Sequence, residues 1–184
     1  MVYGLKVPGT RQFLESHGIP NNIFSVIDEV RPNDLNMLED YLKYNKRMRG
    51  GTAAVIVEPV GPESGTRPVD FDYNQKALEL AHKYGALFIF DEVVTGFRVG
   101  LGGAQGFFNV KPDLTIFGKI VAGGYPAAGG VGGKREYVSL LAAGVAGGAK
   151  KAYCGGTLAA NPLSAMAGYV AIKKIAETDA CAKA

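Results

Sequence analysis

Residues 86–93 read ALFIFDEV, a run of apolar residues that ends in two acids, Asp91 and Glu92. A similar run, AAVIVEPV at 53–60, contains Glu58 near its end, and DLTIFG at 113–118 is followed at once by Lys119. Short, nearly continuous apolar runs are typical of strands in a parallel sheet covered on both faces. Ligands bind such sheets at the carboxyl ends of the strands. We therefore expect Glu58, Asp91 and Lys119 along one sheet edge.

Amphipathic segments separate these runs. Residues 31–48 and 70–84 have apolar side chains at helical spacing, and Asn33 is placed to cap the first helix. A third helix is predicted at about 162–178, after the sequence ANP, and two further short strands at 23–27 and 127–133. Alternating strands and helices predict an α/β fold with a mostly parallel sheet and helices on both faces.

Composition narrows the range of functions. The 184 residues suffice for one domain with a core, and 47% of them are hydrophobic against 20% charged. A net charge of +3 without a block of Lys or Arg argues against a nucleic-acid partner. Cys154 and Cys181 form no CxxC pair and the chain has two His, so no zinc site is expected. Without a membrane-length apolar run or a signal-like N-terminus, a cytoplasmic location is expected.

Asp91 and Lys119 are the candidate reactive residues. Asp91 follows four apolar residues, and a carboxylate partly removed from water requires donors or a cation. It would either cap the following turn or face a protonated ring nitrogen. Lys119, between TIFG and IVAGG, is either a surface lysine or a neutral amine kept nucleophilic by apolar surroundings. Together the two residues suit pyridoxal phosphate, a carbonyl cofactor with a basic ring nitrogen.

Four stretches share a family resemblance: VIVEPV (55–60), FIFDEVVTGFRVGLGGAQGFF (88–108), KPDLTIFGKIVAGGYPAAGGVGGK (111–134) and GGTLAANPLSAMAG (155–168). In order and spacing they resemble class III aminotransferases, and most of all the branch that contains glutamate-1-semialdehyde 2,1-aminomutase. The resemblance implies a fold-type-I, pyridoxal-phosphate-dependent transferase that acts on small amino and keto compounds.

The resemblance also assigns roles to individual residues. Lys119 would form the internal aldimine with pyridoxal phosphate and later act as the general base and acid of the proton shift. Asp91 would pair with the pyridinium N–H, and Val93 would pack on the ring face. Gly156 and Thr157 would reach the cofactor phosphate of the neighbouring subunit in a homodimer, although CGGTLAANP also reads as an ordinary loop and helix cap.

Two positions differ between branches of the family. Many aminotransferases of this class have Gln where Val94 stands, whereas the aminomutase branch is apolar there. That branch usually carries Asn where this sequence has Glu63, which would place a second anion near the cofactor ring. Val94 thus favours the aminomutase branch, and Glu63 leaves the exact reaction open.

Members of this family are much longer than 184 residues. By resemblance, residues 1–184 would form a partial large domain lacking the N-terminal segment and the C-terminal small domain. We expect such a chain to bind pyridoxal phosphate weakly and residues 144–160 to be poorly ordered without a partner subunit. Three alternatives stay open: aminomutase activity, another pyridoxal-phosphate reaction such as decarboxylation or racemisation, and a non-catalytic fragment.

Overall fold

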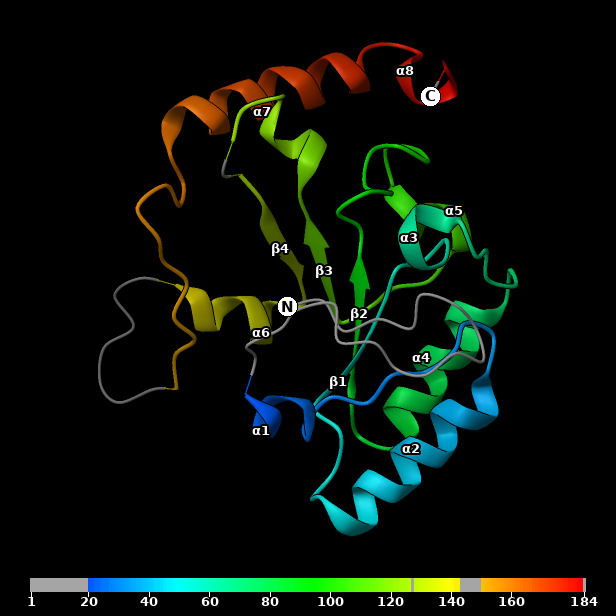
Figure 1. Ribbon diagram of the computed structural model, residues 1–184. Helices are drawn as coiled ribbons and strands as arrows, with labels where there is room; N and C mark the ends of the chain where they lie inside the picture. Colours follow the sequence, from blue (N-terminus) through cyan, green and yellow to red (C-terminus); the bar gives the residue numbers. More distant parts are fainter. Residues whose placement is uncertain (1–19, 127, 143–149, 184) are drawn as a thin grey trace.

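A four-stranded sheet forms the centre of the computed structural model, which describes residues 20–126, 128–142 and 150–183. The strands are β1 (Ala54–Val57), β2 (Leu87–Asp91), β3 (Leu114–Phe117) and β4 (Gly130–Gly133), side by side in that order (Figure 1). β1, β2 and β3 are parallel, and β4 is antiparallel to β3. The predicted α/β fold with a mostly parallel sheet is confirmed.

The strand register brings the candidate residues to one edge. Phe90 pairs with Val57 and with Thr115, and Asp91 pairs with Ile116 at the ends of β2 and β3. Because β1–β3 are parallel, Glu58, Asp91 and Lys119 lie at or just beyond the same edge, which we call the carboxyl edge. The opposite, amino edge carries the residue before β3, Asp113, and the residue after β4, Lys134.

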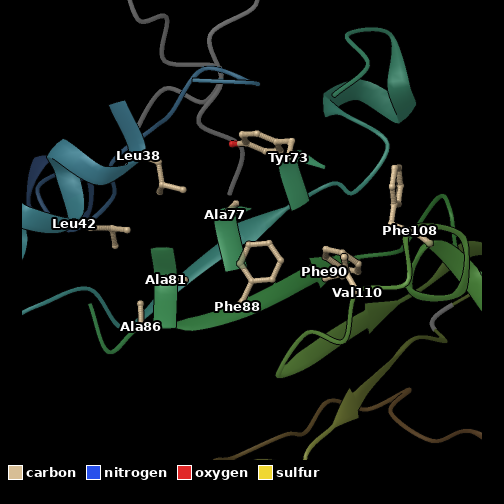
Figure 2. Close-up of a cluster of buried hydrophobic side chains, with 11 residues drawn as sticks. Leu38, Leu42, Tyr73, Ala77, Ala81, Ala86, Phe88, Phe90, Phe108 and Val110 are labelled. Carbon is tan, nitrogen blue, oxygen red and sulfur yellow. The ribbon is translucent and has the colours of Figure 1, made fainter. Parts of the chain in front are cut away.

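Two helices, α2 (Leu35–Met48) and α4 (Tyr73–Lys83), pack on one another, and α4 packs on β2. The predicted periodicity of α2 is seen in Leu38 and Leu42, which are both buried. On α4 the small Ala77 and Ala81 are buried and let the helix approach β2 closely. Figure 2 shows the resulting cluster, which consists of Leu38, Leu42, Tyr73, Ala77, Ala81, Ala86, Phe88, Phe90, Ala104, Phe108 and Val110.

The two faces of the sheet differ. Phe88 and Phe90 are fully buried on the face that α4 covers, whereas Leu87 and Ile89 on the other face are half-buried. Ile56, which pairs with Ile89 on that second face, is 56% exposed. Within the described residues, the face covered by α4 is therefore more completely buried than the opposite face.

The remaining elements are short, apart from one long helix. They are α1 (Asn21–Phe24), α3 (Pro62–Gly65), α5 (Gly103–Phe108), the 3-10 turns η1 (Lys119–Ala122) and η2 (Ser139–Leu141), α6 (Arg135–Val138), α7 (Pro162–Ala176) and α8 (Ala180–Lys183). α7 begins as predicted at ANP, where Asn161 Oδ1 accepts a hydrogen bond from Ser164 N at 2.9 Å. No helix in the described ranges is long and apolar enough to cross a lipid bilayer.

Two local predictions are wrong. Residues 23–27 form no strand, since Asn21–Phe24 is a helical turn, and the Ser25 hydroxyl donates to the Asn22 carbonyl at 2.8 Å. A short apolar run does not by itself distinguish helix from strand. The cap of α2 is Asp34, which accepts from Met37 N at 2.9 Å, and not Asn33. Asn33 instead accepts from Asp70 N at 2.8 Å, a contact 37 residues along the chain that sequence spacing does not reveal.

Candidate active site

Asp91 ends β2 at the carboxyl edge and is half-buried. Its Oδ1 accepts a hydrogen bond from Val93 N at 3.0 Å, so the carboxylate does cap the turn that follows the strand. Within the described part of the chain, no hydrogen bond to Oδ2 is found. The two interpretations of Asp91 are therefore compatible, because one oxygen orders the turn and the other is available to a ligand.

Lys119 begins η1, two residues after the end of β3. Its φ of +50° lies in the left-handed region, which side chains other than glycine seldom adopt. The expectation that apolar neighbours surround the lysine is not met, because Lys119 is exposed. The apolar residues of the same turn face the interior instead: Ala122 is buried, and Ile120 and Val121 are half-buried.

Helix α7, which runs across the top of Figure 1, packs against this turn. A β-carbon placed on Gly168 would overlap the Val121 carbonyl, so the helix backbone approaches η1 as closely as a glycine allows. The Ser164 hydroxyl adds a hydrogen bond to the Pro126 carbonyl at 2.6 Å. The exposed Lys119 therefore belongs to a turn that is packed against α7.

Val93 links the segments that follow β2 and β3. A β-carbon placed on Gly118 would lie 3.1 Å from Val93 Cγ1, inside normal contact distance. The valine side chain therefore lies against the residue before Lys119. Val93, Asp91 and Lys119, all predicted to bind the cofactor, are brought to one stretch of the carboxyl edge.

The segment after β1 is held by Glu58. Its two carboxylate oxygens accept from Glu63 N at 3.2 Å and Ser64 N at 3.0 Å. Glu63 and Ser64 both have positive φ, at +54° and +62°, so α3 is not a regular helix. Glu63 itself is exposed. The structure places it at the carboxyl edge beyond β1, and its proximity to a cofactor ring stays a prediction.

Gly156 and Thr157 are both exposed in an irregular segment ahead of α7. Among the described residues, no hydrogen bond or ion pair joins either of them to Asp91, Lys119 or Glu63. Their predicted contact with a neighbouring subunit stays a prediction. Of the segment 144–160, residues 144–149 lie outside the described residues.

The sequence interpretation missed Glu92, a buried carboxylate next to Asp91. It is 1% exposed, and Ala104 N donates to its Oε2 at 2.6 Å. The only signal for it in the sequence was a second acid after an apolar run, and Asp91 alone received a role. Three of its four donors are on α5, at least 12 residues away in sequence, and the fourth is the Thr95 hydroxyl.

A second buried carboxylate, Asp113, lies at the amino edge and is 2% exposed. It accepts from Lys134 Nζ at 2.6 Å and Phe88 N at 2.7 Å, and pairs with His82 Nε2 at 2.8 Å. Burial alone would raise the pKa of this carboxyl, but the bonds from Lys134, Phe88 and His82 outweigh it and hold the pKa at about 2. The same ion pair raises the pKa of Lys134.

The groups at the carboxyl edge suit a carbonyl cofactor with a basic ring nitrogen. They offer an accessible amine, a carboxylate with one oxygen available, and an apolar side chain between them. A surface hollow elsewhere, over α2, is lined by none of these residues. In residues 20–126, 128–142 and 150–183 no group of three His, Cys, Asp or Glu side chains is arranged to hold a metal ion.

Comparison with known proteins supports the resemblance independently. The family model described as aminotransferase class-III matches residues 13–184. Glutamate-1-semialdehyde 2,1-aminomutase of Desulforamulus reducens is 42% identical over 160 residues, which cover 87% of this chain and 35% of that protein. The chain therefore spans about a third of the length of this relative.

Solved structures agree. An omega-transaminase from Sphaerobacter thermophilus matches 89% of this chain and 36% of its own, with a TM-score of 0.78 and 34% sequence identity. A transaminase solved with pyridoxal phosphate bound matches 86% of this chain and 36% of its own, with a TM-score of 0.73 and 25% identity. Class III aminotransferases use this cofactor. From the match of the family model over nearly the whole sequence, the chain belongs to the class-III aminotransferase family.

Proposed function

We propose that this chain binds pyridoxal phosphate at the carboxyl edge of β2 and β3 and takes part in amino-group transfer of the class III aminotransferase type. The parallel pairing of β2 and β3 carries the proposal, because it brings Asp91 and Lys119 to one sheet edge. The family match over residues 13–184 supports the same chemistry. The contact between Val93 and Gly118, the residue before Lys119, also supports the proposal.

Each residue has a distinct task in this proposal. Lys119 would hold the aldehyde group of the cofactor through Nζ, and its amine would serve as the base and acid that moves a proton on the substrate carbon. Asp91 would hold the ring nitrogen of the cofactor through Oδ2 and favour its protonated form. Val93 packs on the ring face. When bound, pyridoxal phosphate supplies the electron sink for the negative charge formed beside the amine.

Three further residues complete the proposed site. Gly156 and Thr157 bind a phosphate with backbone N–H groups and a hydroxyl, in a homodimer where each chain serves its neighbour. Glu63, exposed beyond β1, adds negative charge at the carboxyl edge and disfavours substrates with a carboxylate nearby. The substrates are small amino and keto compounds.

Aminomutase activity is the second candidate. It is supported by the 42% identity to glutamate-1-semialdehyde 2,1-aminomutase of Desulforamulus reducens and by the apolar Val94. The two reactions would use the same amine and carboxylate. They differ in whether the amino group is passed to a second, keto compound or returned to the same compound.

Reductive trapping tests the proposal. The 184-residue chain is titrated with pyridoxal phosphate, the visible absorption band is followed, and the product is reduced with borohydride and mapped by peptide mass. We expect the cofactor on the peptide that contains Lys119 and its loss in Lys119→Ala. Lys111→Ala is the matched control, since Lys111 is also exposed but lies before β3.

The outcomes separate the candidates. Labelling spread over surface lysines, unchanged in Lys119→Ala, would reject a specific site and leave the non-catalytic fragment. With specific labelling, exchange between an amino donor and a keto acceptor identifies an aminotransferase. Isomerisation of glutamate-1-semialdehyde without any added acceptor identifies an aminomutase.

A further inference from the structure

Glu92 is a buried acid that the proposed reaction does not use. It lies between Asp91 and Val93, two of the proposed cofactor contacts, and it is 1% exposed. Burying a carboxylate is costly unless donors surround it. Its surroundings therefore reveal what the residue does.

Four donors satisfy the Glu92 side chain. Oε2 accepts from Ala104 N at 2.6 Å and from Thr95 Oγ1 at 3.2 Å. Oε1 accepts from Gln105 N and from Gln105 Nε2, both at 3.3 Å. An ionised carboxylate is an acceptor only, so it matches this arrangement of N–H and O–H groups at every bond.

The backbone of α5 is shaped around the same carboxylate. Gly103 has a φ of +58°, and a β-carbon on it would overlap Glu92 Oε2. Only glycine combines this conformation with such a close approach. The first residues of α5 therefore enclose Glu92.

The main chain of Glu92 is held as firmly as its side chain. Its N–H donates to the Ile116 carbonyl of β3 at 2.9 Å, and its carbonyl accepts from Gly96 N at 2.9 Å. Ile116 is also the residue that pairs with Asp91. Residue 92 is thus anchored to β3, to the following turn and to α5 at once.

We infer that Glu92 is a positioning residue that holds Asp91 and Val93 in place for the cofactor, an inference that rests on the proposed function. Asp91 and Val93 are the chain neighbours of Glu92, so a rotation of the backbone at residue 92 would move both. The Val93 N–H to Asp91 Oδ1 bond spans this residue and reports its orientation.

Glu92→Gln tests the inference, because it keeps the size of the side chain and replaces an acceptor with an NH2 donor among other donors. Asp113→Asn is the matched control: it changes the other buried carboxylate of the same sheet in the same way, but at the amino edge. Thr95→Val, which removes one donor to Glu92, is a milder variant if Glu92→Gln does not fold.

The first measurement is amide hydrogen exchange in the chain without cofactor. We expect the Val93 N–H to exchange about tenfold faster in Glu92→Gln, as for the loss of a buried hydrogen bond, and less so in Thr95→Val. In Asp113→Asn the Val93 N–H should exchange as in the unchanged chain. Unaltered exchange at Val93 in both Glu92→Gln and Thr95→Val would overturn the inference.

The second measurement is a titration with pyridoxal phosphate followed by its visible band. We expect affinity to fall about tenfold in Glu92→Gln, and the pH dependence of the band to shift because Asp91 no longer meets the ring nitrogen squarely. Asp113→Asn should change neither the affinity nor the pH dependence of the band, even if it lowers the stability of the fold as much as Glu92→Gln does. If Glu92→Gln had the same affinity and the same absorption band as the unchanged chain, the inference would be overturned. If the unchanged chain did not bind pyridoxal phosphate, the proposed function would be overturned, and the exchange rate of the Val93 N–H would decide the role of Glu92.

Discussion

Asp113, the residue before β3, and Asp91, the last residue of β2, lie at opposite edges of one sheet and in opposite surroundings. Asp113 is 2% exposed and is met by Lys134, His82 and the Phe88 amide. Asp91 is half-buried, and the structure shows it accepting one hydrogen bond, from Val93 N. At the amino edge the carboxylate of Asp113 thus has partners on both oxygens, whereas at the carboxyl edge the carboxylate of Asp91 can still accept a hydrogen bond from a ligand.

The backbone at the carboxyl edge is strained in several places. Glu63, Ser64, Phe97 and Lys119, all in segments that follow β1, β2 and β3, have φ between +50° and +62°. Each such residue costs roughly 1 kcal/mol relative to an ordinary conformation. Strain of this kind persists where the surrounding structure enforces it, often at functional sites. The comparison suggests that the amino edge and the core stabilise the fold while the carboxyl edge serves binding.

The largest expected effect is on stability at the amino edge. Asp113→Ala should lower the free energy of unfolding by about 3 kcal/mol, because the Phe88 amide loses a buried partner, Lys134 loses its counter-charge and His82 loses a hydrogen-bond partner. Asp91→Ala should lower it by less than about 1 kcal/mol. Urea unfolding measures both values. Similar losses for the two variants would break the comparison.

The acid dependence of stability should show the same asymmetry. The pKa of about 2 for Asp113 lies below its ordinary value of 3.8, so ionised Asp113 stabilises the fold above about pH 4. That contribution, about 2 kcal/mol, should be lost as pH falls from about 4 to about 2.

The difference in free energy of unfolding between the unchanged chain and Asp113→Asn isolates the contribution of Asp113. Hydrogen bonds from Lys83, Tyr84 and Lys43 also hold the pKa of Glu39 at about 2, but Glu39 contributes equally to both proteins. The stability difference measured by urea unfolding should shrink between about pH 4 and about pH 2. A difference that stays constant across this range would contradict the assigned role of Asp113.

The smallest expected effect is a gain of stability at the carboxyl edge. Lys119→Gly should raise the free energy of unfolding by up to about 1 kcal/mol, because glycine adopts a φ of +50° without strain. It should abolish borohydride trapping of the cofactor at the same time. Lys111→Gly, where φ is not positive, should be neutral or destabilising by urea unfolding. A loss of stability in Lys119→Gly would show that the lysine is not strained.

The main elements of the fold follow from local pattern. The apolar runs at 53–60, 86–93 and 113–118 became β1, β2 and β3, and the periodic segments became α2, α4 and α7. Where the pattern was short, it failed, as at residues 23–27. Packing against other elements decides such runs, and packing is not visible in a window of five residues.

The sequence by itself determined the family, the sheet, and the pair Asp91 and Lys119 as the candidates for the cofactor. This is possible because strand periodicity and the position of a charge after an apolar run are local properties. Tertiary structure alone decided that Lys119 is exposed on a left-handed turn supported by α7, and that Glu92 is enclosed by α5. It also decided that Asp113 meets His82 and Lys134 at the amino edge. These contacts join residues at least 12 positions apart, and only the folded chain brings their donors and acceptors together.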